Sequence, residues 1–159
     1  MWLWQDVDHF TFNVSERLRG TADYRDDGQF APVAEELALL ARERVEELRC
    51  RFVDLASVGR YMAAQPVGRG LVWESWNAGV VAALVGDAAS AQQRLSVVLG
   101  EDPFVPWMDE AQGAARELLC MVHDQRAVRN WVVDRVLSCR KRLPLEPPKP
   151  TEEVLAGLL

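Results

Sequence analysis

Apolar positions recur at helical spacing through most of the chain. Large apolar side chains return about once per helical turn in residues 72–85, 88–99, 107–122 and 125–142. Residues 32–57 carry another apolar stripe, opposite a run of interleaved acidic and basic residues. This pattern predicts one long helix followed by two antiparallel helical pairs.

The beginning of the chain has a different pattern. Apolar and polar residues alternate in residues 2–18, so Phe10, Phe12 and Val14 share one face. A period of two predicts a short β-hairpin, whose turn we place near residues 6–9. An isolated hairpin is marginal in water, so we expect it to lie on the helices or to pair with a second copy.

The end of the chain is rich in proline. Four prolines fall in residues 144–150, which we expect to be extended, and an apolar strip in residues 152–159 predicts a short last helix. Together the patterns predict a helix-dominated α+β protein. We expect one helix-rich domain over residues 1–143 and a proline-rich tail over residues 144–159.

The corner between the first two paired helices has clear local chemistry. Gly86 is suited to end a helix in the left-handed conformation, and Asp87 can cap the next helix by accepting backbone N–H bonds. Before the corner, Ala78, Gly79 and Ala82 are small enough to let another helix approach closely. These residues predict a tightly packed helical hairpin.

This hairpin also carries a set of residues at characteristic positions: Asn77, Gly79, Gly86, Asp87, Ala91, Asp102 and Pro103. They fall where a tetratricopeptide repeat has the same residue types, so residues 72–105 resemble a single degenerate repeat of that family. The family's early tryptophan is shifted by one, onto Trp76, and two of its bulky positions hold Ala82 and Leu95. The resemblance implies stacked helix pairs and protein binding on a concave surface; an ordinary antiparallel helical hairpin is the alternative interpretation.

Composition and charge restrict the partners. The net charge of −6 argues against nucleic acid as a partner, because phosphate binding needs clustered positive charge. Three widely spaced cysteines suit a reducing compartment, and we find neither a signal peptide nor an apolar run long enough to cross a bilayer. We therefore expect a cytoplasmic protein, and the preference for arginine over lysine suggests a GC-rich bacterial genome.

Candidate catalytic and metal-binding residues are sparse. Cys120 and His123 are one helical turn apart, but two ligands do not make a structural zinc site. Asp6, Asp8 and His9 could supply an acid and a base, yet they fall at the predicted hairpin turn, where exposed polar residues are expected. We predict no catalytic residues, no metal site and no cofactor.

The leading functional hypothesis is a non-enzymatic protein-interaction module that acts through a helical surface. We expect an adaptor or an acidic neutralising binder of the immunity type, with a protein partner and a possible homodimer. The predicted partner-binding residues are Arg60, Tyr61, Arg69, Trp73 and Trp76.

A small-molecule binding protein or an enzyme is the alternative. Its pocket would lie between the helical pairs and would be walled by Tyr61, Trp73, Trp76 and Trp107. Trp73 lies off the stripe that Trp76 belongs to, so we expect it to be the more exposed of the two.

Overall fold

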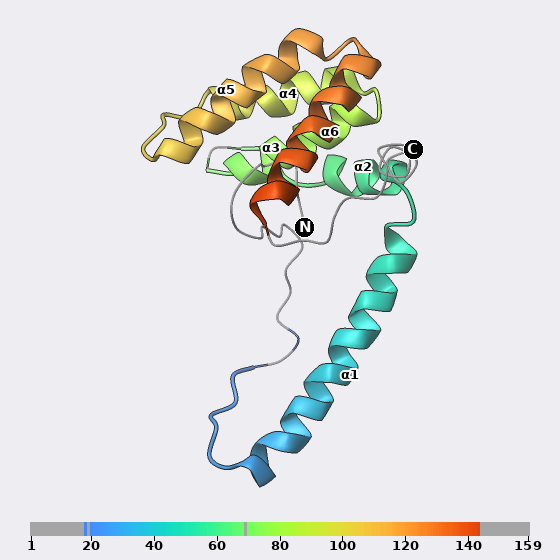
Figure 1. The fold of residues 1–159 in the computed structure, drawn as a ribbon, viewed down its shortest axis with the longest axis vertical. Coiled ribbons are helices and arrows are strands. Elements are labelled where there is room, and N and C mark those ends of the chain that lie inside the picture. The colour runs from blue at the N-terminus through green and yellow to red at the C-terminus, as the bar shows by residue number, and fades with distance from the viewer. Residues whose placement is uncertain (1–17, 19, 69, 144–159) are drawn as a thin grey trace. The chain divides into compact units, whose positions relative to one another are not determined.

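The computed structural model describes residues 18, 20–68 and 70–143 (Figure 1). Within these ranges the chain forms six α-helices and no β-strand. The described residues divide into two compact units, one ending at Val53 and the other beginning at Asp54. The first unit contains α1, and the second contains α2 to α6.

The predicted α+β class is wrong, because the described part of the chain is entirely helical or irregular. Its apolar residues recur at the helical period, which buries one stripe of a helix rather than one face of a sheet. The predicted β-hairpin falls on residues 2–18, and all of these except Leu18 lie outside the described residues. The predicted C-terminal helix and proline-rich tail, residues 144–159, also lie outside them.

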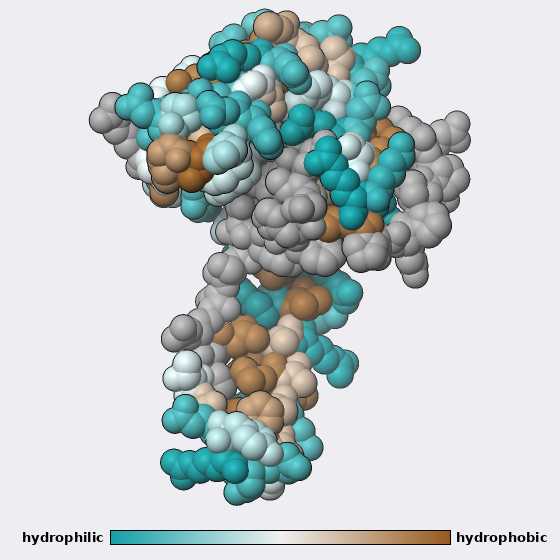
Figure 2. Space-filling view, turned by 60° about the vertical axis from the view of Figure 1, so that its left-hand side comes forward, coloured by the Kyte–Doolittle hydropathy of each residue, from teal (hydrophilic) through white to brown (hydrophobic). Residues whose placement is uncertain are grey.

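α1 runs from Asp27 to Arg51 and begins five residues earlier than predicted. Its start is set by Asp26, whose side chain accepts a hydrogen bond of 2.8 Å from the backbone N–H of Gln29. Pro32, which we predicted in the first turn, therefore lies inside the helix. No residue of α1 is buried, and Figure 2 shows apolar side chains exposed along it. Leu39, for example, has 62% of its surface accessible.

α2, which spans Leu55–Ala63, shows that the predicted helix over residues 32–57 is interrupted. Asp54 and Ser57 form a capping box: Asp54 Oδ1 accepts from the backbone N–H of Ser57 at 2.6 Å, and Ser57 Oγ accepts from that of Asp54 at 3.3 Å. This cap starts a new helix at Leu55. The new helix continues to Ala63, past the predicted end at residue 57.

α3 (Val72–Leu84) and α4 (Ala88–Leu99) form the predicted helical hairpin, which the structure confirms. Gly86 adopts a φ of +85°, and the N–H of Asp87 donates to the carbonyl of Ala82 at 2.9 Å. Asp87 then caps α4 by accepting from the N–H of Ser90 at 3.0 Å. Local chemistry at the corner therefore produces the turn that the sequence predicts.

α5 (Pro106–Met121) and α6 (Gln125–Arg142) form the second pair. Asp124 caps α6 by accepting from the N–H groups of Arg126 and Ala127, both at 3.0 Å. The first residue of α6, Gln125, donates through Nε2 to the carbonyl of Ala83 at 2.8 Å. This bond joins the start of α6 to the end of α3.

α3 is the central helix of its unit and contacts α2, α4, α5 and α6 (Figure 1). Eleven of its thirteen residues are buried, so it is enclosed on all sides rather than along one stripe. A Cβ on Gly79 would lie 2.7 Å from Leu95 Cδ2, which shows how closely α3 and α4 approach. Because α3 contacts four helices, its side chains take part in lining the pockets between α3 and its neighbours.

Candidate functional site

The tryptophan pocket lies between α3, α5 and α6 and has a volume of about 360 Å³. We give it this name because Trp73, Trp76 and Trp107 form its aromatic wall. Trp73 comes from the first turn of α3, and Trp107 follows Pro106 at the start of α5. Two helix N-termini therefore bring aromatic side chains to one opening.

Trp73 and Trp107 stack on each other, with ring centroids 4.6 Å apart and ring planes inclined by 16°. Both side chains are half-buried, so one part of the pair packs on the core while another part remains accessible. Stacked aromatic pairs contribute about 0.5–1.5 kcal/mol beyond the area that they bury. The stack fixes the pocket's aromatic surface before any ligand arrives.

Trp76, which also lines the pocket, belongs to a second aromatic pair. Trp76 is 1% exposed and packs edge-to-face against Trp131, with ring centroids 6.1 Å apart. Trp131 donates through Nε1 to Glu117 Oε2 at 3.0 Å, and the guanidinium carbon of Arg135 lies 4.8 Å from the centre of its ring. One indole thus binds a guanidinium on its face and a carboxylate at its N–H.

Charged side chains line the pocket in two rows of opposite sign. Glu110 and Glu117 come from α5, whereas Arg135 and Arg142 come from α6. Each pair is separated by seven residues, which places its members on one face of their helix. The pocket therefore combines indole faces with an acidic edge along α5 and a basic edge along α6.

This arrangement is suited to binding. Indole faces take up planar or cationic groups, and carboxylates and guanidinium groups provide charged hydrogen bonds of fixed direction. The aromatic and charged groups come from three helices that already pack together, so little ordering is needed when a ligand binds.

Comparisons with protein-family models, with curated proteins and with solved structures each found no match.

A second pocket, of about 320 Å³, lies between α2, α3 and α4. Small residues such as Gly59, Ala78 and Ala82 line much of it, together with the exposed Arg60. Arg94 also reaches it but has a structural role. Its guanidinium is almost fully enclosed.

Arg94 of α4 is 5% exposed and caps the end of α2. Its guanidinium donates to the carbonyls of Ala63 and Gln65, both at 2.8 Å, and to that of Pro66 at 3.1 Å. Burial lowers the pKa of Arg94 from its ordinary value. The three carbonyls compensate for the loss of water around the charge, which makes Arg94 a link between α4 and α2.

The predicted partner-binding residues are divided between these regions. Trp73 and Trp76 line the tryptophan pocket, and Arg60 lines the second pocket. Tyr61 is half-buried against the core and lines neither of the two, while Arg69 lies outside the described residues. The predicted aromatic wall of the alternative hypothesis is thus assembled by Trp73, Trp76 and Trp107 without Tyr61.

Our sequence analysis missed the charged rows and the role of Arg94. The spacing of seven between Glu110 and Glu117, and between Arg135 and Arg142, was a readable signal for one face of a helix. Arg94 falls within the apolar stripe of α4, next to Leu95, where a charged residue is unusual and indicates a specific partner.

The two residues weighed as metal ligands are not joined in one site. Cys120 is exposed, and His123 lies beyond the end of α5, where its Nε2 is 3.4 Å from Gln92 Nε2. In residues 18, 20–68 and 70–143, no three His, Cys, Asp or Glu side chains form a group that could hold a metal ion. None of the helices in these same ranges is both long and apolar enough to cross a membrane.

Proposed function

We propose that this protein is a non-enzymatic interaction module, which binds a protein partner at the tryptophan pocket. The observation that carries the proposal is the half-buried stack of Trp73 on Trp107 at the mouth of that pocket. Tryptophan is enriched among the residues that dominate the energy of protein interfaces, and a pre-ordered aromatic anchor loses little entropy on binding.

The segment before α5 supports the same surface. Phe104 is 83% exposed and lies three residues before Trp107 in the chain, between Pro103 and Pro106. The two prolines restrict this segment, so the exposed ring is presented on a stiff connection. Exposed aromatic groups are a feature of protein-binding surfaces.

The acidic net charge of −6 favours a basic partner. Within this proposal the protein is a bacterial, cytoplasmic adaptor or a neutralising binder of the immunity type. The resemblance of residues 72–105 to a tetratricopeptide repeat agrees with a protein-binding role. Oppositely charged surfaces mainly increase the association rate and exclude wrong partners.

The test is an affinity capture with two matched baits. Wild-type protein should recover a partner in stoichiometric amount, Trp107→Ala should lose it, and Tyr24→Ala should retain it. Tyr24 is a suitable control because it is an exposed aromatic residue on the other unit. Circular dichroism confirms that both variants fold. Equal recovery by Trp107→Ala and wild type would refute the proposed surface.

Small-molecule binding, with or without catalysis, is the second candidate. Its support is the pocket volume of about 360 Å³, which falls in the range of ligand sites, and the presence of both acidic and basic groups around the indoles. A thermal-shift screen against metabolites separates the two candidates. A large shift that Trp107→Ala removes would favour the small-molecule function, provided that no protein partner is captured.

A further inference from the structure

We propose that the tryptophan pocket binds an arginine side chain of a basic protein partner, with the guanidinium stacked on the Trp73–Trp107 pair and paired with Glu110. This inference rests on the proposed function and names the chemistry of the contact. It starts from an arrangement that shares two residues, Arg135 and Glu117, with the lining of the pocket.

That arrangement is the set formed by Trp131, Arg135 and Glu117. The guanidinium carbon of Arg135 lies 4.8 Å from the ring centre of Trp131, and Glu117 accepts the indole N–H of the same ring at 3.0 Å. Two residues that line the pocket, Arg135 and Glu117, therefore already place a guanidinium and a carboxylate around the neighbouring indole of Trp131. Such contacts become stronger as water is removed from around them.

The accessible side of the pocket offers the same groups to an outside ligand. Trp73 and Trp107 stack nearly parallel, so each ring covers one face of the other and a ligand meets an outer face of the pair. Glu110 lies one turn after Trp107 on α5 and lines the pocket, and the structure records no hydrogen bond or ion pair for its carboxylate within the described ranges. An indole pair with an adjacent unpaired carboxylate is complementary to a planar cation.

The basic edge of the pocket sets the direction of approach. Arg135 and Arg142 already place two guanidinium groups on the α6 side of the pocket. A guanidinium is therefore best placed on the α5 side, between the stacked indoles and Glu110. Arginine suits this position better than lysine, because its flat group stacks on an indole and donates two parallel hydrogen bonds to a carboxylate.

The binding test uses a blocked tripeptide, acetyl-Gly-Arg-Gly-amide, titrated into the full chain and followed by NMR of the indole N–H groups. The control peptide contains citrulline, which has nearly the same shape without the charge. Saturable shifts of the Trp73 and Trp107 signals are expected with the arginine peptide, weaker shifts with the lysine analogue, and none with citrulline. Equal shifts with citrulline, or with a glutamate peptide, would overturn the proposal.

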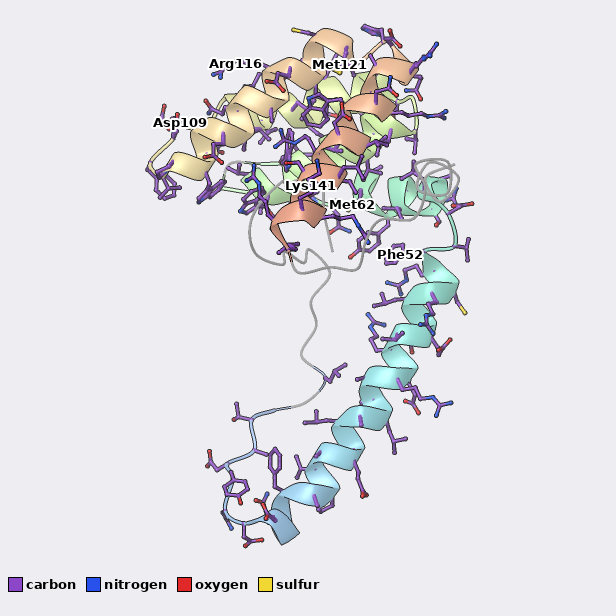
Figure 3. All side chains as sticks on the ribbon, viewed as in Figure 1. Phe52, Met62, Asp109, Arg116, Met121 and Lys141 are labelled. Atoms are coloured by element: carbon purple, nitrogen blue, oxygen red, sulfur yellow. The ribbon has the colours of Figure 1, made fainter. Side chains whose placement is uncertain are left out.

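Two carboxylate variants make the test specific. Glu110→Gln should weaken binding of the arginine peptide about fivefold, the effect of losing one exposed ion pair of about 1 kcal/mol. Asp109→Asn should leave it unchanged, because Asp109 is exposed on the same helix (Figure 3) and does not line the pocket. Equal affinities for Glu110→Gln and wild type would also overturn the proposal.

The aromatic requirement is tested by Trp107→Ala and Trp107→Phe. Alanine should abolish the peptide-induced shifts, and phenylalanine should retain weaker binding because it keeps an aromatic face. If alanine disturbs folding, the phenylalanine and Glu110→Gln variants still decide the result. Free L-arginine, which carries a carboxylate and an amine as well, should bind no better than the blocked peptide. Tighter binding of free arginine would refute a protein side chain as the ligand.

Failure of this inference can be distinguished from failure of the proposed function. No response to the arginine peptide, together with partner capture that depends on Trp107, would overturn the arginine site and leave the docking surface. A response to the peptide that depends on Glu110 would support the arginine site even if no protein partner is captured, and the proposed function would then fail alone.

Discussion

Gly79 allows α3 and α4 to pack at short distance. A methyl group at this position would lie 2.7 Å from Leu95 Cδ2 and 2.8 Å from Leu95 Cγ, which is closer than van der Waals contact. Leu95 is fully buried, so its side chain cannot turn out into solvent without leaving the core. The absence of a side chain at one residue therefore sets the separation of two helices.

We predict that Gly79→Ala lowers the free energy of unfolding by about 1–3 kcal/mol, the usual cost of overpacking a well-packed core. Urea unfolding followed by circular dichroism measures this change. Gly113→Ala is the matched control, because Gly113 is also inside a helix and a Cβ there meets no atom within 4 Å. It should be neutral or stabilising, since alanine is the better helix former. Equal losses of unfolding free energy in both variants would contradict the role of Gly79 in setting the distance between α3 and α4.

Helix caps determine where several elements begin. Asp54 and Asp87 each accept hydrogen bonds from the first turn of the helix that follows, α2 and α4 respectively. Hydrogen bonds from Ser57 lower the pKa of Asp54, and those from Ser90 lower the pKa of Asp87. The ionised carboxylates are therefore favoured in the folded protein.

These lowered pKa values predict acid sensitivity of a definite sign. An aspartate has a pKa of about 3.9 in an unfolded chain, so its contribution to stability is complete above that pH. The contribution is lost as the pH falls through the lower pKa of the folded state, because protonation weakens the cap.

Asp87→Asn tests this prediction, because asparagine caps a helix without titrating. Between pH 5 and pH 2.5, the free energy of unfolding should fall less in Asp87→Asn than in the wild type, as measured by urea titration. Asp134→Asn, which alters an exposed residue of α6, should follow the wild type. A steeper loss in Asp87→Asn would be inconsistent with the cap. At pH 7, Asp87→Ala should cost about 1 kcal/mol.

At the scale of the whole molecule, the two units differ in how much they bury. No residue of α1 is buried, whereas eleven of the thirteen residues of α3 are. Local opening of a helix costs less free energy when it exposes little buried apolar surface. The unit that contains α3 to α6 should therefore be the more resistant to opening.

Hydrogen exchange followed by mass spectrometry on the full chain tests this difference. We predict that the amides of α1 exchange well before those of α3, because opening α1 disturbs no buried core residue. Amides of α4 should exchange at an intermediate rate, since α4 buries a single stripe. Protection of α1 equal to that of α3 would mean that α1 is covered in solution, for example by a partner or a second copy.

The sequence by itself determined the local structure of the second unit. The corner of the α3–α4 hairpin is determined by the positive φ of Gly86 and by the helix cap that Asp87 provides. The apolar period correctly predicts α4 and α6. These features depend on neighbours within a few residues, which the sequence contains directly. The break before α2 was equally local, because the Asp54–Ser57 capping pair is visible in the sequence, but we did not recognise it.

Only the tertiary structure decided which distant residues form the candidate site. Trp73 and Trp107 are far apart in the chain and stack because α3 and α5 begin at the same side of the bundle. Arg94 of α4 reaches carbonyls near the end of α2 only after both helices have packed on α3. Such contacts depend on how helices cross, and a helical period specifies which face is apolar without specifying the partner that the face meets.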